Sequence, residues 1–302
     1  MKQVCCIGHI THDRIITPKR SLDLAGGTSF YFAHGISNLP KRVGFQLVTK
    51  GGAYIQKEVD ILRGKGLDVI SYPSQNTVFF ENKYGANSNN RTQRVLAKAD
   101  PFTLDEVKPL QADVFHLGTL LADDFSVDVV RNLAEKGKVS IDVQGYLREV
   151  RGENVCAIDW KDKKEVLGFI DFIKLNEHEM ETVTGSRDPR EVALMLARCG
   201  VDEIVITLGS YGSLVYAHNR FFEIPAFTPK EVVDATGCGD TYSTGYLYMR
   251  CQGAGPDEAG RFAAAMCTLK LEHSGPFDGT IDDVRNLMTQ DALVIPYSES
   301  AL

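Results

Sequence analysis

The sequence predicts an α/β fold in three layers, with helices on both faces of a mainly parallel sheet and a small β-sheet lid. Apolar runs of strand length alternate with helix-like patterns along most of the 302 residues. Two further stretches combine strand-like runs with polar turns and no helix. Because the chain carries no repeat or low-complexity tract, we expect a single domain over residues 1–302, with lid segments near residues 11–30 and 75–98.

The main sheet is predicted from short apolar runs. Strands of a parallel sheet are buried on both faces, so they are apolar throughout instead of alternating with polar residues. These runs span residues 3–10, 43–49, 68–71, 114–118, 138–143, 172–176, 203–209 and 212–217. The helical patterns between and after them span residues 126–136, 188–199 and 256–271.

The lid is predicted from residues 13–30 and 76–100, where strand-like runs follow one another directly. The paired glycines Gly26 and Gly27 lie between a lid strand and a helical run over residues 28–39. Glycine adopts backbone conformations that other residues avoid, and a hinge requires that freedom. We therefore expect this turn to open and close the lid.

Composition excludes several classes of protein. Lys+Arg 33 against Asp+Glu 40 gives a net charge of -7 and a pI near 5.6, which leaves no basic field for nucleic acid. No apolar run approaches the roughly 18 residues that span a bilayer, and the N-terminus does not resemble a signal peptide. Seven cysteines without a C-x-x-C pair favour reduced thiols over disulfides or a zinc site. We expect a cytoplasmic protein without a membrane or nucleic-acid partner.

The segment DATGCGD, residues 234–240, carries the strongest chemical signal. Its glycines come directly before a helical pattern over residues 242–249. The first N–H groups of a helix have no intrahelical partner and lie at the positive end of its dipole. Gly237, Cys238 and Gly239 are therefore expected to direct backbone amides at an anion such as a phosphoryl group.

Asp240 places a carboxylate beside this predicted anion site. An acceptor hydroxyl that attacks phosphorus must lose its proton, so Asp240 is a candidate general base. The alternative is that Asp240 only caps the helix, where aspartate is favoured in any case.

Two other nucleotide-using classes lack their fingerprints. The first predicted strand is followed by no G-x-G-x-x-G, which a dinucleotide-dependent oxidoreductase requires, and no G-x-x-x-x-G-K-[ST] of a P-loop NTPase occurs. A ligand-sensing protein without catalytic activity is a separate alternative, and the presence of Asp240 argues against it.

The motif DATGCGD resembles the C-terminal signature of the ribokinase-like (PfkB) family of carbohydrate kinases. CCIGHITHD resembles the family's first strand with its substrate-binding aspartate, here Asp13, and AGGTS resembles the di-glycine turn, here Gly26 and Gly27. KLNEHEMETVTG resembles the segment that organises magnesium through water, here Asn176 and Glu179. Without the family, the last two residues also fit a capping box.

The resemblance extends to the nucleotide site. VITLGSYGSLVY resembles the family's nucleotide-binding segment, here Thr207, Gly209 and Gly212, and AAAMCTLKLEHSGP resembles the terminal helix and loop near the adenine. These pieces occur in family order across nearly the whole chain. The resemblance implies a ribokinase-like fold, ATP and Mg²⁺ as cofactors and, as in some relatives, a monovalent cation held by backbone oxygens near Asp234.

Departures from the family pattern bear on the substrate. GGTSFYFA lacks the asparagine that many ribokinase-like members carry after the glycines, and DVQGYLR has Gln144 in place of an asparagine. These segments look more like the branch that phosphorylates myo-inositol or nucleosides. Arg91 and Arg94 of the lid could reach an anionic substrate, but exposed arginines on a β-ribbon are usually only solvated.

We therefore expect an ATP-dependent kinase that acts on a hydroxyl of a small polyhydroxylated substrate, a sugar or a cyclitol. The alternatives are a nucleoside kinase and a non-catalytic sensor of the same fold. In the kinase, Asp13 would orient the acceptor. A homodimer joined through the β lid is a further expectation.

Overall fold

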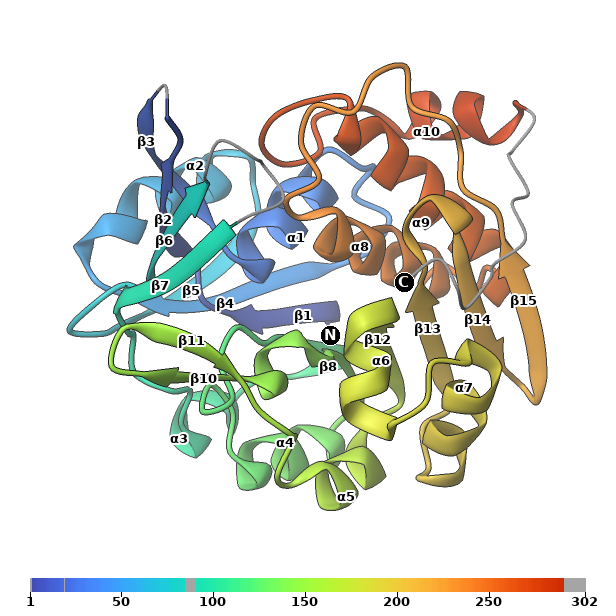
Figure 1. Ribbon diagram of the computed structural model, residues 1–302, viewed down its shortest axis with the longest axis horizontal. Coiled ribbons are helices and arrows are strands. Elements are labelled where there is room, and N and C mark those ends of the chain that lie inside the picture. The colour runs from blue at the N-terminus through green and yellow to red at the C-terminus, as the bar shows by residue number, and fades with distance from the viewer. Residues whose placement is uncertain (1, 19, 85–90, 291–302) are drawn as a thin grey trace.

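The computed structural model describes residues 2–18, 20–84 and 91–290, and its central element is a nine-stranded sheet (Figure 1). The strand order is β15-β14-β13-β12-β9-β8-β1-β4-β5. Seven strands are parallel: β1 (Lys2–Gly8), β4 (Phe45–Gly51), β5 (Asp68–Pro73), β8 (Ala112–Gly118), β9 (Lys138–Asp142), β12 (Phe172–Asn176) and β13 (Glu203–Thr207). Two antiparallel strands complete one edge: β14 (Ser213–Ala217) and β15 (Arg220–Ile224). The predicted, mainly parallel sheet is confirmed, although the sequence reading did not include β15.

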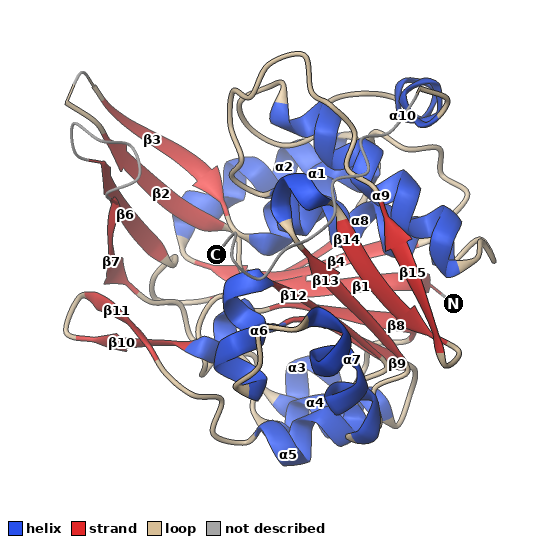
Figure 2. Ribbon diagram, turned by 45° about the vertical axis from the view of Figure 1, so that its right-hand side comes forward, coloured by secondary structure: helices blue, strands red, loops and turns tan. Residues whose placement is uncertain are grey.

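Helices cover both faces of this sheet (Figure 2). Along β1, Val4 and Cys6 belong to one core, whereas Cys5 and Ile7 belong to the other, because successive side chains of a strand point to opposite faces. The first core is covered by α1 (Thr28–Ser37), α2 (Gln56–Gly64), α8 (Cys238–Arg250), α9 (Pro256–Leu271) and α10 (Ile281–Met288). The second is covered by α3 (Leu104–Val107), α4 (Val127–Ala134), α5 (Lys163–Val166), α6 (Glu177–Thr184) and α7 (Pro189–Arg198). The three-layer prediction is confirmed.

The predicted helices begin where the sequence carries a capping residue or a proline. Ser126 accepts a hydrogen bond from the Val129 amide at 3.4 Å and caps α4, and Asp188 caps α7 directly before a proline at the first helical position. Pro256 likewise begins α9. Short 3-10 turns join other elements: η1 (Ala53–Ile55), η2 (Val143–Leu147), η3 (Leu167–Phe169) and η4 (Gly209–Tyr211).

A second sheet of six strands, in the order β10-β11-β7-β6-β2-β3, lies beside the carboxyl ends of the parallel strands (Figure 2). Its strands are β2 (Thr11–Ile16), β3 (Ser21–Gly26), β6 (Phe79–Tyr84), β7 (Arg91–Ala97), β10 (Arg148–Arg151) and β11 (Asn154–Ala157). The first four fall within the two predicted lid stretches. The prediction left out β10 and β11, which are only four residues long and rich in polar side chains. The first lid stretch was predicted to reach residue 30, but its last strand ends at Gly26 because α1 begins at Thr28. A bilayer-spanning helix is absent from the described ranges.

Candidate active site

The predicted site residues gather at the carboxyl ends of the parallel strands. Asn176 ends β12 and Thr207 ends β13, and the two residues are register partners. Asp142 ends β9 and is the register partner of Lys174 on β12. Ligands of open α/β sheets bind at this edge.

The anion cap is the start of α8. Its N-cap residue Gly237 has φ 76°, in the left-handed region where glycine carries little strain. A Cβ atom at Gly237 would lie 2.3 Å from the ring of Tyr31, so only glycine lets α1 pack against the cap. Cys238 was predicted to offer its amide to an anion, but this amide already donates to the carbonyl of Ala235 at 3.2 Å. Within the described residues, the amides of Gly237, Gly239 and Asp240 have no acceptor, so the Asp240 amide takes the place of the Cys238 amide in the predicted donor set.

Asp240 lies in the first turn of α8 and is half-buried. Burial and the neighbouring charge of Asp142 raise the pKa of Asp240 to about 7, while Lys174 and the Thr28 hydroxyl act in the opposite direction. A carboxyl with this pKa can accept and release a proton near neutral pH, as a general base must. The N-cap residue of α8 is Gly237, and no side chain forms a capping hydrogen bond there.

Asp142 and Lys174 form a buried ion pair beneath the cap, with 3.4 Å between Oδ2 and Nζ. The hydroxyl of Ser243, on α8, donates to Oδ1 of Asp142 at 2.8 Å. The Lys174 ammonium would lie 3.1 Å from a Cβ atom placed on Gly239, so it is directly beside the cap. Sequence reasoning missed both residues as site members. The available signal was that Lys174 precedes Asn176 by two positions and therefore shares its side of β12.

Asn176 and Glu179 form the capping box that sequence analysis left as the alternative reading. The Asn176 Oδ1 atom accepts from the amides of His178 and Glu179, both at 2.9 Å, and Glu179 Oε2 accepts from the Asn176 amide at 2.9 Å. Burial raises the pKa of Glu179, and Lys174 opposes that effect. The charge of Arg148 also acts on Glu179 and, like that of Lys174, favours its ionised form.

The predicted nucleotide residues surround the end of β13. The Thr207 hydroxyl lies 3.5 Å from the carbonyl of Leu175. Gly209 and Gly212 both have positive φ, 57° and 91°. A Cβ atom at Gly212 would lie 2.1 Å from the carbonyl of Ile224, so glycine is required for the close approach of two chain segments. The described contacts thus give Gly212 a structural function of its own.

The residues predicted to bind the acceptor substrate lie in the lid sheet and at its junction with α1. The Thr11 hydroxyl donates to Asp13 Oδ1 at 2.7 Å, and a Cβ atom on Gly26 would lie 2.3 Å from the other oxygen of Asp13. Gly27 has φ 91° and is the N-cap residue directly before α1. The charges of Asp13 and Asp240 both act on the phenol of Tyr31, whose pKa is raised first by burial and then by these carboxylates and Asp234. Asp13 and Asp240 are thus both close enough to Tyr31 for their charges to act on its phenol.

Of the two lid arginines that could reach a substrate, Arg94 has a described side chain, and that side chain is held by ion pairs. Arg94 pairs with Glu81 at 2.6 Å and with Glu153 at 2.7 Å, so it joins lid strands and is not directed at a substrate. The side chain of Arg91 lies outside the described residues.

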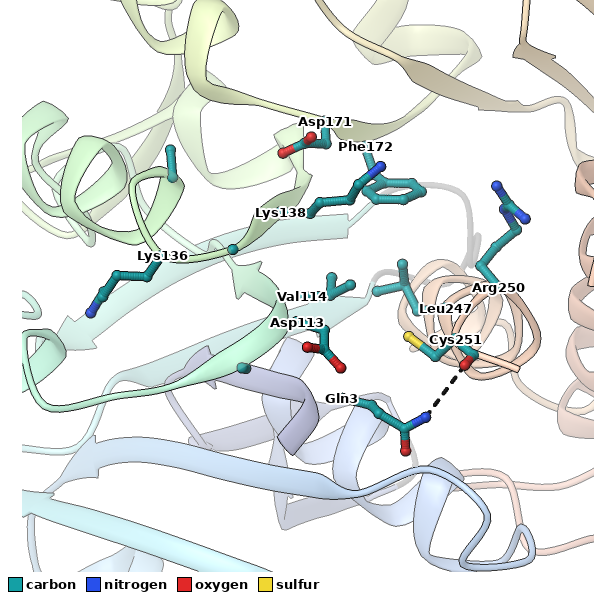
Figure 3. Close-up of a pocket in the computed structure, with 13 residues that line it drawn as sticks. Gln3, Asp113, Val114, Lys136, Lys138, Asp171, Phe172, Leu247, Arg250 and Cys251 are labelled. Atoms are coloured by element: carbon teal, nitrogen blue, oxygen red, sulfur yellow. Dashed lines mark hydrogen bonds between the residues drawn. The ribbon is translucent and has the colours of Figure 1, made fainter. Parts of the chain in front are cut away.

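A cavity of about 580 Å³ lies at the opposite edge of the sheet, where β8, β9 and β12 begin (Figure 3). Its wall includes Asp113, Lys138, Phe172 and Cys251, and the Lys138 ammonium lies 5.4 Å from the centre of the Phe172 ring. None of the predicted site residues lines this cavity.

Comparisons with known proteins agree with this arrangement. Residues 73–282 match the model of the pfkB family carbohydrate kinases. The chain is 26% identical to a cytidine kinase of Thermococcus kodakarensis over 289 residues, which is 93% of this chain and 100% of the relative. It is 24% identical to a nucleoside kinase of Methanocaldococcus jannaschii over 294 residues, 91% of this chain and 92% of the relative.

Solved structures give the same picture. A pyrophosphate-dependent kinase of the ribokinase family, complexed with a pyrophosphate analog and myo-inositol, superposes with a TM-score of 0.83 at 26% identity, covering 94% of this chain and 100% of that one. The ribokinase of Arabidopsis thaliana, complexed with ribose and ATP, shares the fold with a TM-score of 0.76 at 20% identity, covering 96% and 99% of the two chains. The chain belongs to the pfkB family of carbohydrate kinases, enzymes that phosphorylate hydroxyl groups.

Proposed function

We propose that this kinase transfers the γ-phosphoryl group of ATP to a hydroxyl of a small sugar or cyclitol, with Asp240 as the general base. One observation carries the proposal: a carboxyl with a pKa of about 7 lies at the same helix start as the unpaired amides of Gly237 and Gly239. The amides suit an anionic phosphoryl group, and the carboxyl suits the proton that the acceptor loses. A sensor without activity would gain nothing from this combination.

In the proposed reaction the acceptor oxygen attacks the γ-phosphorus in line with the bridging oxygen, whose bond to that phosphorus breaks as ADP leaves. The acceptor O–H bond breaks, and its proton moves to Asp240. The amides of Gly237 and Gly239, with the Lys174 ammonium beside them, stabilise the developing charge. Asp13 holds the acceptor by accepting hydrogen bonds from its hydroxyls.

The donor site is proposed from the same edge of the sheet. Mg²⁺, when bound with ATP, neutralises charge on the transferring phosphates. Asn176 and Glu179 would reach it through water, which suits the tendency of Mg²⁺ to keep several waters. In the described residues, no three histidine, cysteine, aspartate or glutamate side chains form a metal-binding group, so ATP itself would supply ligands. Thr207, Gly209 and Gly212 would border the nucleotide.

A nucleoside is the second candidate acceptor. Two relatives that this chain matches over at least 91% of its length are named as a cytidine kinase and a nucleoside kinase. The pyrophosphate-dependent relative bound to myo-inositol supports the cyclitol instead, and it makes pyrophosphate the second candidate donor.

A panel assay separates these candidates. Polyols, cyclitols and nucleosides are each incubated with the protein and either ATP or pyrophosphate, and the phosphorylated product is quantified by mass spectrometry. We expect turnover with ATP and at least one polyol or cyclitol. Turnover restricted to nucleosides would establish the alternative acceptor, and turnover only with pyrophosphate would overturn the proposed donor.

The role of Asp240 is tested by Asp240→Asn. The variant should bind ATP with unchanged affinity in calorimetry, because the amides of the cap remain. Phosphotransfer should fall by at least about a hundredfold, because the proton acceptor is lost. Asp113→Asn removes an exposed carboxyl at the opposite edge and should leave the rate unchanged. Near-normal turnover of Asp240→Asn would refute the assignment.

A lid-mediated homodimer stays a prediction. Leu22 and Leu24 on the edge strand β3 are 40% and 37% exposed, and an exposed apolar edge favours pairing with another chain. Light scattering of the wild type and of Leu22→Lys would check it, because the charge should shift a dimer to monomer.

A further inference from the structure

Lys270 is a buried lysine in the last turn of α9, and its side chain is 0% exposed. Its ammonium donates to the carbonyl oxygen of Asp234 at 2.7 Å. The carbonyl oxygen of His273 and the carboxylate of Asp234 both lie 3.5 Å from the same nitrogen. Three oxygens of the chain therefore surround one buried positive charge.

Two of these oxygens belong to Asp234, in the segment that leads into the anion cap, and the third belongs to His273, after the end of α9. The carbonyl of Leu271, at the end of α9, accepts from the amides of Val233 at 2.8 Å and Asp234 at 3.2 Å. The thiol of Cys267 donates to the carbonyl of Cys238 at 3.0 Å. Helix α9 thus forms several hydrogen bonds with residues 233–238, and the hydrogen bond from the Lys270 ammonium is the one with a charged donor.

The chemistry of this contact is that of a small cation in a cage of oxygens. An ammonium has three donors, and backbone carbonyls are also the ligands that replace water around a potassium ion. A buried ammonium is costly unless it is paired, and Asp234 supplies the countercharge. Burial raises the pKa of Asp234, but the Thr236 amide and hydroxyl and the charge of Lys270 hold it below its usual value, so the carboxylate stays ionised.

We infer that the Lys270 ammonium is a built-in monovalent cation that holds residues 234–239 in their anion-binding conformation, so that this kinase needs no free potassium ion. The inference replaces the free cation expected near Asp234 from sequence, because the lysine already occupies the position beside these carbonyls. It rests on the proposed role of the cap in phosphoryl transfer. Lys270 is then a positioning residue, which acts through the cap and not on the reacting atoms.

The experiment combines two variants with a choice of salts. Lys270→Ala leaves space beside the carbonyls, whereas Lys270→Met fills it without a charge. Activity and melting temperature are measured at equal ionic strength in potassium, ammonium or tetramethylammonium chloride, the last being too large to enter. Lys136→Ala is the matched control, because Lys136 also donates to two carbonyls, at 2.7 and 3.3 Å, but lies at the opposite edge of the sheet.

The wild type should show equal activity in all three salts. In tetramethylammonium, Lys270→Ala should lose on the order of ten to a hundredfold in rate because the cap is displaced. Potassium or ammonium should restore most of this rate and raise the melting temperature of Lys270→Ala alone, since a bound ion stabilises the folded state. Lys270→Met should stay slow in every salt, and Lys136→Ala should behave as the wild type.

Several results would overturn the inference: potassium stimulation of the wild type, full activity of Lys270→Ala without small cations, or a slow Lys270→Ala that no cation restores. The first of these needs no variant, so a failure of Lys270→Ala to fold leaves the inference testable. If the salt dependence of the melting temperature occurs as expected while no substrate is turned over, the proposed function fails and the cation role stands.

Discussion

At the scale of single residues, Asp240 depends on the groups that face it from other elements. Asp142 on β9 raises its pKa, whereas Lys174 on β12 and Thr28 on α1 lower it. Other titratable neighbours of Asp240, namely the phenol of Tyr31 and the thiols of Cys6, Cys238 and Cys267, stay neutral because burial raises their pKa values. The ionisation of Asp240 is therefore set first by burial and then by the ion pair beneath it.

Asp142→Asn should shift the pH profile of kcat. Loss of the neighbouring negative charge lowers the pKa of Asp240, so the base stays ionised at lower pH. We expect the acidic limb of the profile to move down by about one pH unit. An unmoved limb, or a limb shifted upward, would show that Asp142 does not act on Asp240.

Asp240→Asn should also stabilise the protein at pH 8. The folded-state pKa of about 7 exceeds the usual value of 3.8, so the folded state binds this proton more tightly. The group's favourable contribution is lost as pH rises through 7, and ionised Asp240 destabilises the fold above it. We expect the free energy of unfolding of Asp240→Asn in urea to exceed that of the wild type by about 1–3 kcal/mol at pH 8.

At pH 5 wild-type Asp240 already holds its proton, so the stability difference should shrink. A difference that is equal at both pH values would mean that the substitution acts through packing instead of ionisation. Asp113→Asn, at an exposed carboxyl, should show no difference at either pH.

Asp13 should act on binding more than on turnover. Asp13→Ala removes the proposed acceptor contact at the lid, so KM for the acceptor should rise by about tenfold or more while KM for ATP stays unchanged. Initial-rate kinetics with each substrate varied in turn would check this, and an unchanged acceptor KM would remove Asp13 from the site.

At the scale of elements, helix α8 has a glycine with positive φ at each end, and this allows a matched comparison. Gly237 has φ 76° and no space for a Cβ atom against Tyr31, whereas Gly253 has φ 86° and nothing within 4 Å. Both alanine substitutions incur backbone strain, but only Gly237→Ala adds a clash. We expect Gly237→Ala to cost about 1–3 kcal/mol more than Gly253→Ala in urea unfolding, and equal costs would contradict the packing of α1 on the cap.

The elements differ in how well sequence could predict them. Strands of the parallel sheet are continuous apolar runs, and α7 and α9 begin at prolines, so local signals sufficed. β10, β11 and β15 are short and carry charged or polar residues, and they form strands because neighbouring strands pair with them. β10 with β11 and β14 with β15 form hairpins with two residues between the strands, so a local turn signal existed, whereas the pairing of β11 with β7 joins distant segments.

The site residues also differ in how well the sequence could predict them. The glycine turn before Asp240 is a local motif and was predictable from its spacing. The pair of Asp142 and Lys174 joins residues 32 positions apart through the register of β9 and β12, which the sequence does not reveal. The hydrogen bond from the Cys238 amide to the Ala235 carbonyl depends on the geometry of the turn, which the sequence does not reveal either.

At the scale of the whole molecule, the lid sheet supplies Asp13 and the main body supplies Asp240. Gly27, with φ 91°, lies where lid strand β3 passes into α1. If the two parts close together on substrate, hydrogen exchange at the amides of β2 and β3 should slow when acceptor and ATP are both present. Exchange in β4 and β5 of the main sheet should stay unchanged, and equal slowing everywhere would indicate general stabilisation instead of closure.

The order in which the chain emerges from the ribosome has a consequence for when this site becomes active. Asp13, Asp142 and Lys174 are synthesised early, and Asp240 comes only after four-fifths of the chain. The lysine that fixes its loop follows 30 residues later. A nascent chain, or a chain terminated before residue 240, therefore lacks the proposed base, and under this proposal it would not consume nucleotide.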